Sequence, residues 1–149
     1  MNYKWISDIV IGLTETYGTN DVYSLCDFLN IEIIHVHNNI KSNSYFVRNS
    51  VGDEYIFVKP GLEYTEERAL IAHELGHAIL HTDLNVTFYC MPLCNKCKLE
   101  LQANQFAAEL LLVNIDFDKY AYDGSTIKSF AYEIEVPENL IELKRKRNC

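Results

Sequence analysis

The stretch ALIAHELGHAILH, residues 69–81, carries three histidines at a spacing of four in an otherwise apolar run. Residues four apart lie on one face of an α-helix, so the side chains of His73 and His77 can reach one metal ion. Glu74 projects about a quarter-turn from them, where its carboxylate can contact a water held by the metal. In a plain core helix, each such polar group would cost about 1 to 3 kcal/mol to bury without a partner. The spacing therefore favours a helix that binds zinc.

The last histidine of the stretch, His81, is predicted to have a different role. It follows His73 by eight residues, which is about 12 Å of helical rise and too far for both to hold one ion. We expect His81 to lie near the C-terminal end of the helix, where the helix dipole favours histidine. A contact that supports the site or touches the substrate is the alternative.

A third protein ligand must come from another segment, because a catalytic zinc ion usually has three protein ligands and one open position. The segment ELQANQFAAELLL, residues 100–112, offers Glu100 and Glu109. Asn104 lies one turn after Glu100, and such a pair can place a carboxylate on the metal and an amide behind a ligand histidine. Glu109 projects from nearly the opposite side of the same helix. Spacing therefore modestly favours Glu100.

The residues before this site predict helices and then a small sheet. With 48% hydrophobic residues, the chain can bury one core, and we expect a single domain over residues 1–149. Helices are predicted around Ile6–Leu13 and after Asn20, the expected N-cap. Runs rich in β-branched and aromatic residues predict three strands, the last two joined by a hairpin turn: Ile31–Val36, Ser44–Arg48 and Glu54–Lys59. The expected fold class is α+β, a small antiparallel sheet packed against a helical core that carries both motifs.

Helix signals also surround the two motifs. Thr65 is the expected N-cap of the histidine helix, because Glu66 and Glu67 follow it and suit the positive end of a helix. Residues 83–98 have no consistent period and predict a connecting loop. Further helices are expected over residues 99–113, 127–134 and 137–147.

The chain has five cysteines, an odd number, and its N-terminus shows no secretion signal. We therefore expect reduced thiols and a cytoplasmic protein. Cys90, Cys94 and Cys97 fall in the predicted loop between the two motifs. They can hold a second metal ion together with one further ligand, or they can be plain thiols, and the sequence leaves both interpretations open.

Charge and hydropathy exclude two classes of partner. The net charge is −8, and because residues 144–147 carry +4, the rest of the chain sums to −12. Such acidity argues against direct binding of nucleic acid, and the basic tail is expected to be a solvated helix C-terminus. No apolar run approaches the eighteen or so residues of a membrane span, so no membrane partner is expected.

The segment HELGHAILH followed by ELQANQFAAELLL resembles the ImmA/IrrE family, zinc-dependent metallopeptidases of phages and mobile elements with a gluzincin-like HExxH motif. The resemblance covers residues 55–112 and implies a zincin-like fold. It implies that His73 and His77 bind zinc, that Glu74 is the general base, that Glu100 is the third ligand and that Asn104 supports the site. The family often continues this helix as LLMP, whereas residues 112–114 are Leu-Val-Asn.

Two functions from different classes follow. The first is a zinc endopeptidase, for which the resemblance implies a helix-turn-helix transcriptional repressor as substrate. In this hypothesis, the sheet edge near residues 54–59 pairs with an extended substrate strand, and Tyr89, Tyr120 or Tyr122 polarises the scissile carbonyl. The second is a zinc-stabilised binding module without catalysis that sequesters a regulator, using the two C-terminal helices. The alternative for those helices is that they close the core.

Overall fold

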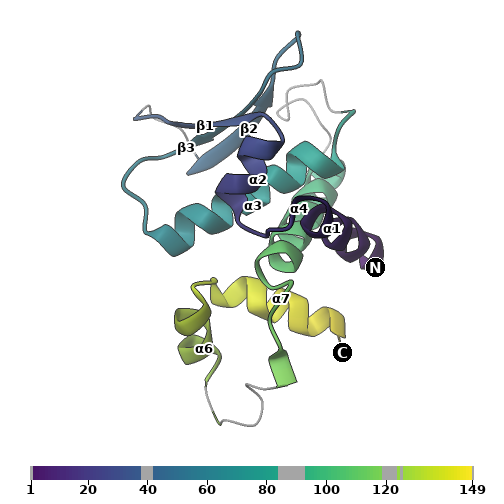
Figure 1. The fold of residues 1–149 in the computed structure, drawn as a ribbon, viewed down its shortest axis with the longest axis vertical. Coiled ribbons are helices and arrows are strands. Elements are labelled where there is room, and N and C mark those ends of the chain that lie inside the picture. The colour runs from purple at the N-terminus through teal and green to yellow at the C-terminus, as the bar shows by residue number, and fades with distance from the viewer. Residues whose placement is uncertain (1, 38–41, 84–92, 119–123, 125, 149) are drawn as a thin grey trace.

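The computed structural model describes residues 2–37, 42–83, 93–118, 124 and 126–148. In chain order the elements are α1 (Lys4–Tyr17), α2 (Val22–Phe28), β1 (Ile31–His35), β2 (Ser44–Arg48), β3 (Glu54–Val58), α3 (Tyr64–Leu80), α4 (Leu93–Leu111), α6 (Ile127–Ile134) and α7 (Glu138–Asn148). The sheet lies at one end of the molecule, α6 and α7 lie at the other, and α3 and α4 lie between them (Figure 1). The predicted α+β class is confirmed.

The sheet is mixed, whereas the sequence predicted an antiparallel one. Its strand order is β1-β3-β2. The hairpin is antiparallel as expected, with Ser44 opposite Val58, but β1 runs parallel to β3, with Ile31 opposite Glu54. The tight turn at residues 49–53 imposes an antiparallel arrangement only on the two strands that it joins. No such turn joins β1 to β3, so their direction depends on the path of the chain between them.

The turn itself is stabilised by Asn49. Its side-chain oxygen accepts hydrogen bonds from the backbone N–H groups of Val51 and Asp53, at 3.1 and 2.8 Å. Gly52 has a φ of 95°, which only glycine adopts without strain. The turn places β2 and β3 side by side, so β3 is the central strand and has no free edge. The prediction that residues 54–59 offer the edge for a substrate strand is therefore wrong.

Helices α3 and α4 approach closely at Gly76. A Cβ atom built on Gly76 would lie 3.1 Å from the Cα atom of Ala103 and 3.1 Å from the Cβ atom of Phe106. Few residues other than glycine fit such a contact, because a side chain there would separate the two helices. The sequence motif thus contains its own packing surface, and this surface brings the histidine helix against the helix that carries Glu100.

Three helix starts differ from the predictions. Asp21, not Asn20, caps α2, since its carboxylate accepts from the N–H of Ser24 at 2.9 Å. Asn20 instead donates to the carbonyl of Leu110 at 3.3 Å. Helix α3 begins at Tyr64, so Thr65 lies within its first turn. Helix α4 begins at Leu93 rather than at residue 99, because nothing in the sequence after Pro92 interrupts a helix.

Helices α6 and α7 have the predicted positions, and α7 packs on α4. Its Lys144 is buried, contrary to the expected solvated tail. The Nζ atom of Lys144 donates to the carbonyl oxygen of Leu112 at 2.9 Å and lies 3.5 Å from Oε2 of Glu109. Within the part of the chain that the structure describes, no helix has both the length and the apolar character needed to cross a bilayer.

Candidate active site

The two histidines of the HELGH motif point their Nε2 atoms at each other. These atoms lie 3.2 Å apart, and the imidazole rings meet edge to face with centroids separated by 4.8 Å. The i, i+4 spacing on α3 produces this pairing, because such residues lie one above the other on a helix. Because the two Nε2 atoms are so close, both can bind the same metal ion.

Glu100 of α4 completes the cluster. Its Oε2 atom lies 3.2 Å from Nε2 of His73, and its Oε1 atom lies 3.5 Å from Nε2 of His77. Ligand atoms from all three residues lie within 4.8 Å of one another. Two imidazole nitrogens and one carboxylate oxygen are a donor set that binds zinc and similar divalent metals. The residues therefore fit the metal ion that the spacing predicted.

The ion pairing within the cluster shifts two pKa values in opposite directions. Hydrogen bonds from His73 and His77 lower the pKa of Glu100 far below its usual range. Burial opposes protonation of His73, but the hydrogen bond to Glu100 and the charge of Glu74 outweigh it, so the pKa of His73 is raised. A negative field of this kind attracts protons and metal cations alike, because both neutralise the same carboxylates.

Asn104 lies behind His73, where the sequence predicted an amide. Its Oδ1 atom is 2.8 Å from Nδ1 of His73. An amide oxygen only accepts, so Nδ1 carries a proton, and the neutral ring therefore has its lone pair on Nε2, the atom that faces the cluster. This contact selects the tautomer of His73 that can bind a metal.

Glu74 lies beside the cluster and is buried, with 6% of its surface exposed. Its Oε1 atom accepts a hydrogen bond from the hydroxyl of Ser44 at 2.7 Å. Ser44 opens β2 and is itself buried. Ser44 could not be predicted as a site residue, because one serine at the start of a strand, far from the motif along the chain, gives no signal of its own.

His81 lies at the C-terminal end of α3, as expected, and is also buried. Its Nδ1 atom lies 3.0 Å from Nδ1 of His77, and its Nε2 atom lies 3.0 Å from Oε1 of Gln102. Burial lowers the pKa of His81, which favours the neutral imidazole. Gln102 was not among the predicted site residues, although the spacing of four between His77 and His81 already placed these two rings together.

Glu109, the other candidate for third ligand, faces away from the cluster. It is 2% exposed and lies between α4 and α7, where Nε2 of Gln105 donates to its Oε1 atom at 2.9 Å. Lys144 contacts its other oxygen. Glu109 therefore contributes to the packing of the C-terminal helix, and Glu100 is the glutamate of α4 that meets the histidines.

Most of the other predicted site residues lie outside the described part of the chain. Cys90 lies outside the described residues, as does the side chain of Cys94, and Cys97 is an exposed free thiol. The second metal site therefore stays a prediction. Three tyrosines proposed to polarise the carbonyl also lie outside the described residues: Tyr89, Tyr120 and Tyr122.

Arg48 of β2 fixes the C-terminal end of α3 to the sheet. Its guanidinium donates to the carbonyl oxygen of Ala78 at 3.1 Å and to that of Thr82 at 3.2 Å. Glu54 of β3 pairs with the same guanidinium, 2.7 Å from its Nε atom. Carbonyls at a helix end lack partners within the helix, so this cation both satisfies them and holds the histidine helix in place.

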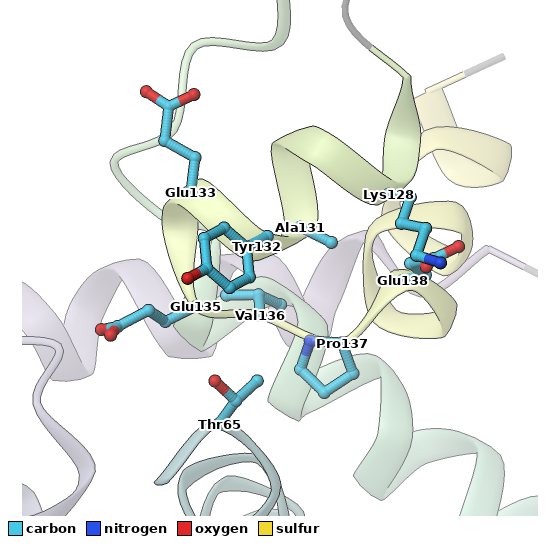
Figure 2. Close-up of a pocket in the computed structure, with 9 residues that line it drawn as sticks. All are labelled: Thr65, Lys128, Ala131, Tyr132, Glu133, Glu135, Val136, Pro137 and Glu138. Atoms are coloured by element: carbon cyan, nitrogen blue, oxygen red, sulfur yellow. The ribbon is translucent and has the colours of Figure 1, made fainter. Parts of the chain in front are cut away.

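A pocket of about 570 Å³ lies elsewhere, where the turn between α6 and α7 meets the first turn of α3. Figure 2 shows Tyr132, Val136 and Pro137 on one side of it and Thr65 on the other. None of its lining residues belongs to the cluster of His73, His77 and Glu100. The candidate active site is therefore distinct from this pocket.

Two histidines on one helix, a carboxylate on the helix that crosses it and a buried glutamate beside them are features of the zincin class of metallopeptidases. A family model described as the IrrE N-terminal-like domain, Peptidase M78, matches residues 26–145. This chain therefore belongs to the ImmA/IrrE family of metallopeptidases.

Two relatives are similar over most of the chain. An uncharacterized immunity region protein 2 of Bacillus phage phi105 is 32% identical over 145 residues, which cover 95% of this chain and 90% of that protein. Metallopeptidase ImmA of Bacillus subtilis (strain 168) is 38% identical over 116 residues, which cover 74% of this chain and 65% of ImmA. The names associate relatives of this chain with a phage immunity region and with metallopeptidase activity.

Proposed function

We propose that this protein is a zinc-dependent endopeptidase in which His73, His77 and Glu100 hold the metal ion and Glu74 is the general base. The observation that carries the proposal is the convergence of three ligand atoms within 4.8 Å of one another, on two helices packed through Gly76. These three residues would hold a zinc ion, which would lower the pKa of a bound water to about 7 and polarise a carbonyl.

Glu74 moves the proton in this mechanism. Ser44 holds its Oε1 atom, which leaves Oε2 to accept the proton of the attacking water. The same carboxylate then returns the proton to the amine that leaves when the peptide bond breaks. Burial of Glu74 and Ser44 excludes competing water from this hydrogen bond, which strengthens the electrostatic control of the carboxylate.

Strand β2 is the edge that suits an extended substrate. It borders β3 on one side only in the described part of the sheet. Its first residue contacts Glu74, so a peptide that added to the free edge of β2 would run beside the general base. Backbone hydrogen bonds would then orient the scissile bond, as in other complexes formed by strand addition.

The proposed substrate is a transcriptional repressor of a phage or mobile element. Support comes from the immunity region named for one relative and from the name ImmA of the other. The resemblance to the ImmA/IrrE family implies a helix-turn-helix repressor. Cleavage of such a repressor would release the genes that it silences.

A first experiment tests the metal site. Elemental analysis of protein purified without chelator should find one zinc ion per chain. Replacement of His73 and His77 together by alanine should abolish zinc binding. No zinc in the unmodified protein, or unchanged zinc in the double variant, would refute the metal assignment.

A second experiment separates proteolysis from sequestration. Each variant is expressed with the helix-turn-helix repressor that the family resemblance implies is encoded nearby, and cleavage is followed by mass spectrometry. We expect Glu74→Gln to retain zinc and partner binding but to lose cleavage by about 10²- to 10⁴-fold, the usual contribution of a general base. Glu63→Gln, an exposed change at the residue that immediately precedes the same helix, is the matched control. Full derepression by Glu74→Gln without cleavage would instead support the zinc-stabilised binding module.

A further inference from the structure

A chain of hydrogen bonds leads from His77 away from the metal cluster and ends on the neighbouring helix. Nδ1 of His77 lies 3.0 Å from Nδ1 of His81, and Nε2 of His81 lies 3.0 Å from Oε1 of Gln102. Both histidines are buried, with 7% and 8% of their surfaces exposed. This series of hydrogen bonds therefore connects α3 to α4. Because it is buried, a donor or an acceptor left without a partner in it would be costly.

The chemistry of Gln102 determines where the protons lie. Its Oε1 atom can only accept, so Nε2 of His81 must be the donor. A neutral imidazole has one N–H group, which leaves Nδ1 of His81 as an acceptor. Nδ1 of His77 must then donate to it. In the neutral ring of His77, this leaves the lone pair on Nε2, the atom that faces His73 and Glu100.

The opposite proton order would block the site. If Nδ1 of His81 carried the proton, Nδ1 of His77 would have to accept and Nε2 of His77 would be protonated. That nitrogen points into the cluster, 3.2 Å from Nε2 of His73. A protonated nitrogen has no lone pair for a metal ion.

We propose that His81 and Gln102 are positioning residues that fix the tautomer and ring orientation of His77 and thereby raise the affinity for zinc. The inference rests on the proposed zinc site. Asn104 performs the same task for His73 directly, whereas Gln102 acts on His77 through His81. Helix α4 thus supplies one ligand and the acceptors that orient both histidines.

Zinc affinity tests this proposal without reference to catalysis. The dissociation constant is measured at pH 7.5 by competition with a chromophoric chelator, using zinc alone as the probe. We expect His81→Leu and Gln102→Leu each to weaken binding by about 10- to 100-fold, as removal of partners behind metal ligands usually does. His81→Asn, whose side-chain oxygen can replace Nδ1 as the acceptor, should stay within about threefold of the unmodified protein. The control His35→Leu changes an exposed histidine on β1 and should leave the affinity unchanged.

The second measurement determines which ring nitrogen of His81 and of His77 carries the proton. A purely structural role of His81 would not require any particular tautomer. Long-range ¹H–¹⁵N correlation spectra of the unmodified protein should show His81 protonated at Nε2, both with zinc and without it. In the zinc-loaded protein, His77 should be protonated at Nδ1. His81 protonated at Nδ1 would overturn the proposal, even if the His81→Leu protein proved too unstable to study.

The outcomes separate this inference from the proposed function. Unmodified protein that takes up no zinc overturns the metal site, and the tautomer of His81 in the metal-free protein still tests the hydrogen-bonded chain. Unmodified protein that binds zinc no more tightly than folded His81→Leu and Gln102→Leu proteins overturns this inference alone.

Discussion

Ser44 of β2 donates a hydrogen bond to Glu74 of α3, with 2.7 Å between its Oγ atom and Oε1 of the carboxylate. Both side chains are buried. The contact joins the sheet to the histidine helix at the residue proposed as general base. It fixes which oxygen of the carboxylate remains available to a water.

Ser44→Ala should lower kcat by about 10-fold or more, because a hydrogen bond to a charged group contributes about 1.5 to 3 kcal/mol. Zinc content and KM should not change, since Ser44 contacts none of the proposed ligands. Ser44→Thr keeps the hydroxyl and should retain most activity. Ser129→Ala, an exposed change on α6, is the control. Full kcat in Ser44→Ala would show that Glu74 needs no such partner.

Glu100→Gln should weaken zinc binding by roughly 100-fold or more, because one of three protein ligands loses its charge. Glu109→Gln makes the same chemical change on the same helix, but at the contact with Lys144. It should keep zinc affinity within about threefold and reduce the free energy of unfolding by about 3 kcal/mol, the cost of breaking a buried ion pair. Chelator competition and urea unfolding measure the two quantities. If Glu109→Gln weakened zinc binding and Glu100→Gln did not, the third ligand would be Glu109.

Gly76→Ala should reduce the free energy of unfolding by about 1 to 3 kcal/mol, since its methyl group would force Ala103 and Phe106 to move. Gly12→Ala, inside α1, meets nothing within 4 Å. It should therefore stabilise the protein by about 0.5 to 1 kcal/mol through the better helix propensity of alanine. Urea unfolding of the metal-free proteins measures both. Equal effects at the two glycines would contradict the close approach of α3 and α4.

Zinc affinity should rise with pH by as much as about tenfold per pH unit, because zinc competes with a proton for His73. The pKa of His73 is raised from the ordinary value of 6.5, so this rise should continue above pH 6.5. Glu100 should add no proton competition in this range, since its pKa is lowered from 4.5. In the metal-free protein, the shift of His73 stabilises the fold below the unfolded pKa, and this contribution is lost as pH rises through the folded pKa. Chelator competition between pH 5.5 and 8 measures the affinity. A flat profile would exclude protonation of His73 as a competitor.

Local spacing was sufficient for the parts of the site that lie on one helix. Residues four apart share a helix face whatever the rest of the chain does, so the pairing of His73 with His77 followed from the sequence. The position of Asn104 one turn after Glu100 followed in the same way. The α+β class was also predictable, because the periods of helices and strands differ.

Predictions were wrong where a feature depends on contacts between segments that are distant in the sequence. The parallel alignment of β1 with β3 reflects the path between strands, which residue patterns do not encode. The burial of Lys144 depends on how α7 meets α4, since a basic residue near a helix end is more often solvated.

Helical periodicity was enough to place His73 and His77 on one face of α3 and to offer Glu100 and Glu109 on nearly opposite sides of α4. The contact of Glu100 with the histidines and that of Glu109 with Lys144 depend instead on how the helices pack together. The tertiary structure also brings Ser44 to Glu74 and Gln102 to His81. The physical reason is that helix spacing orders side chains around one axis, whereas the packing of α3 on α4 through Gly76 sets which faces of two axes meet.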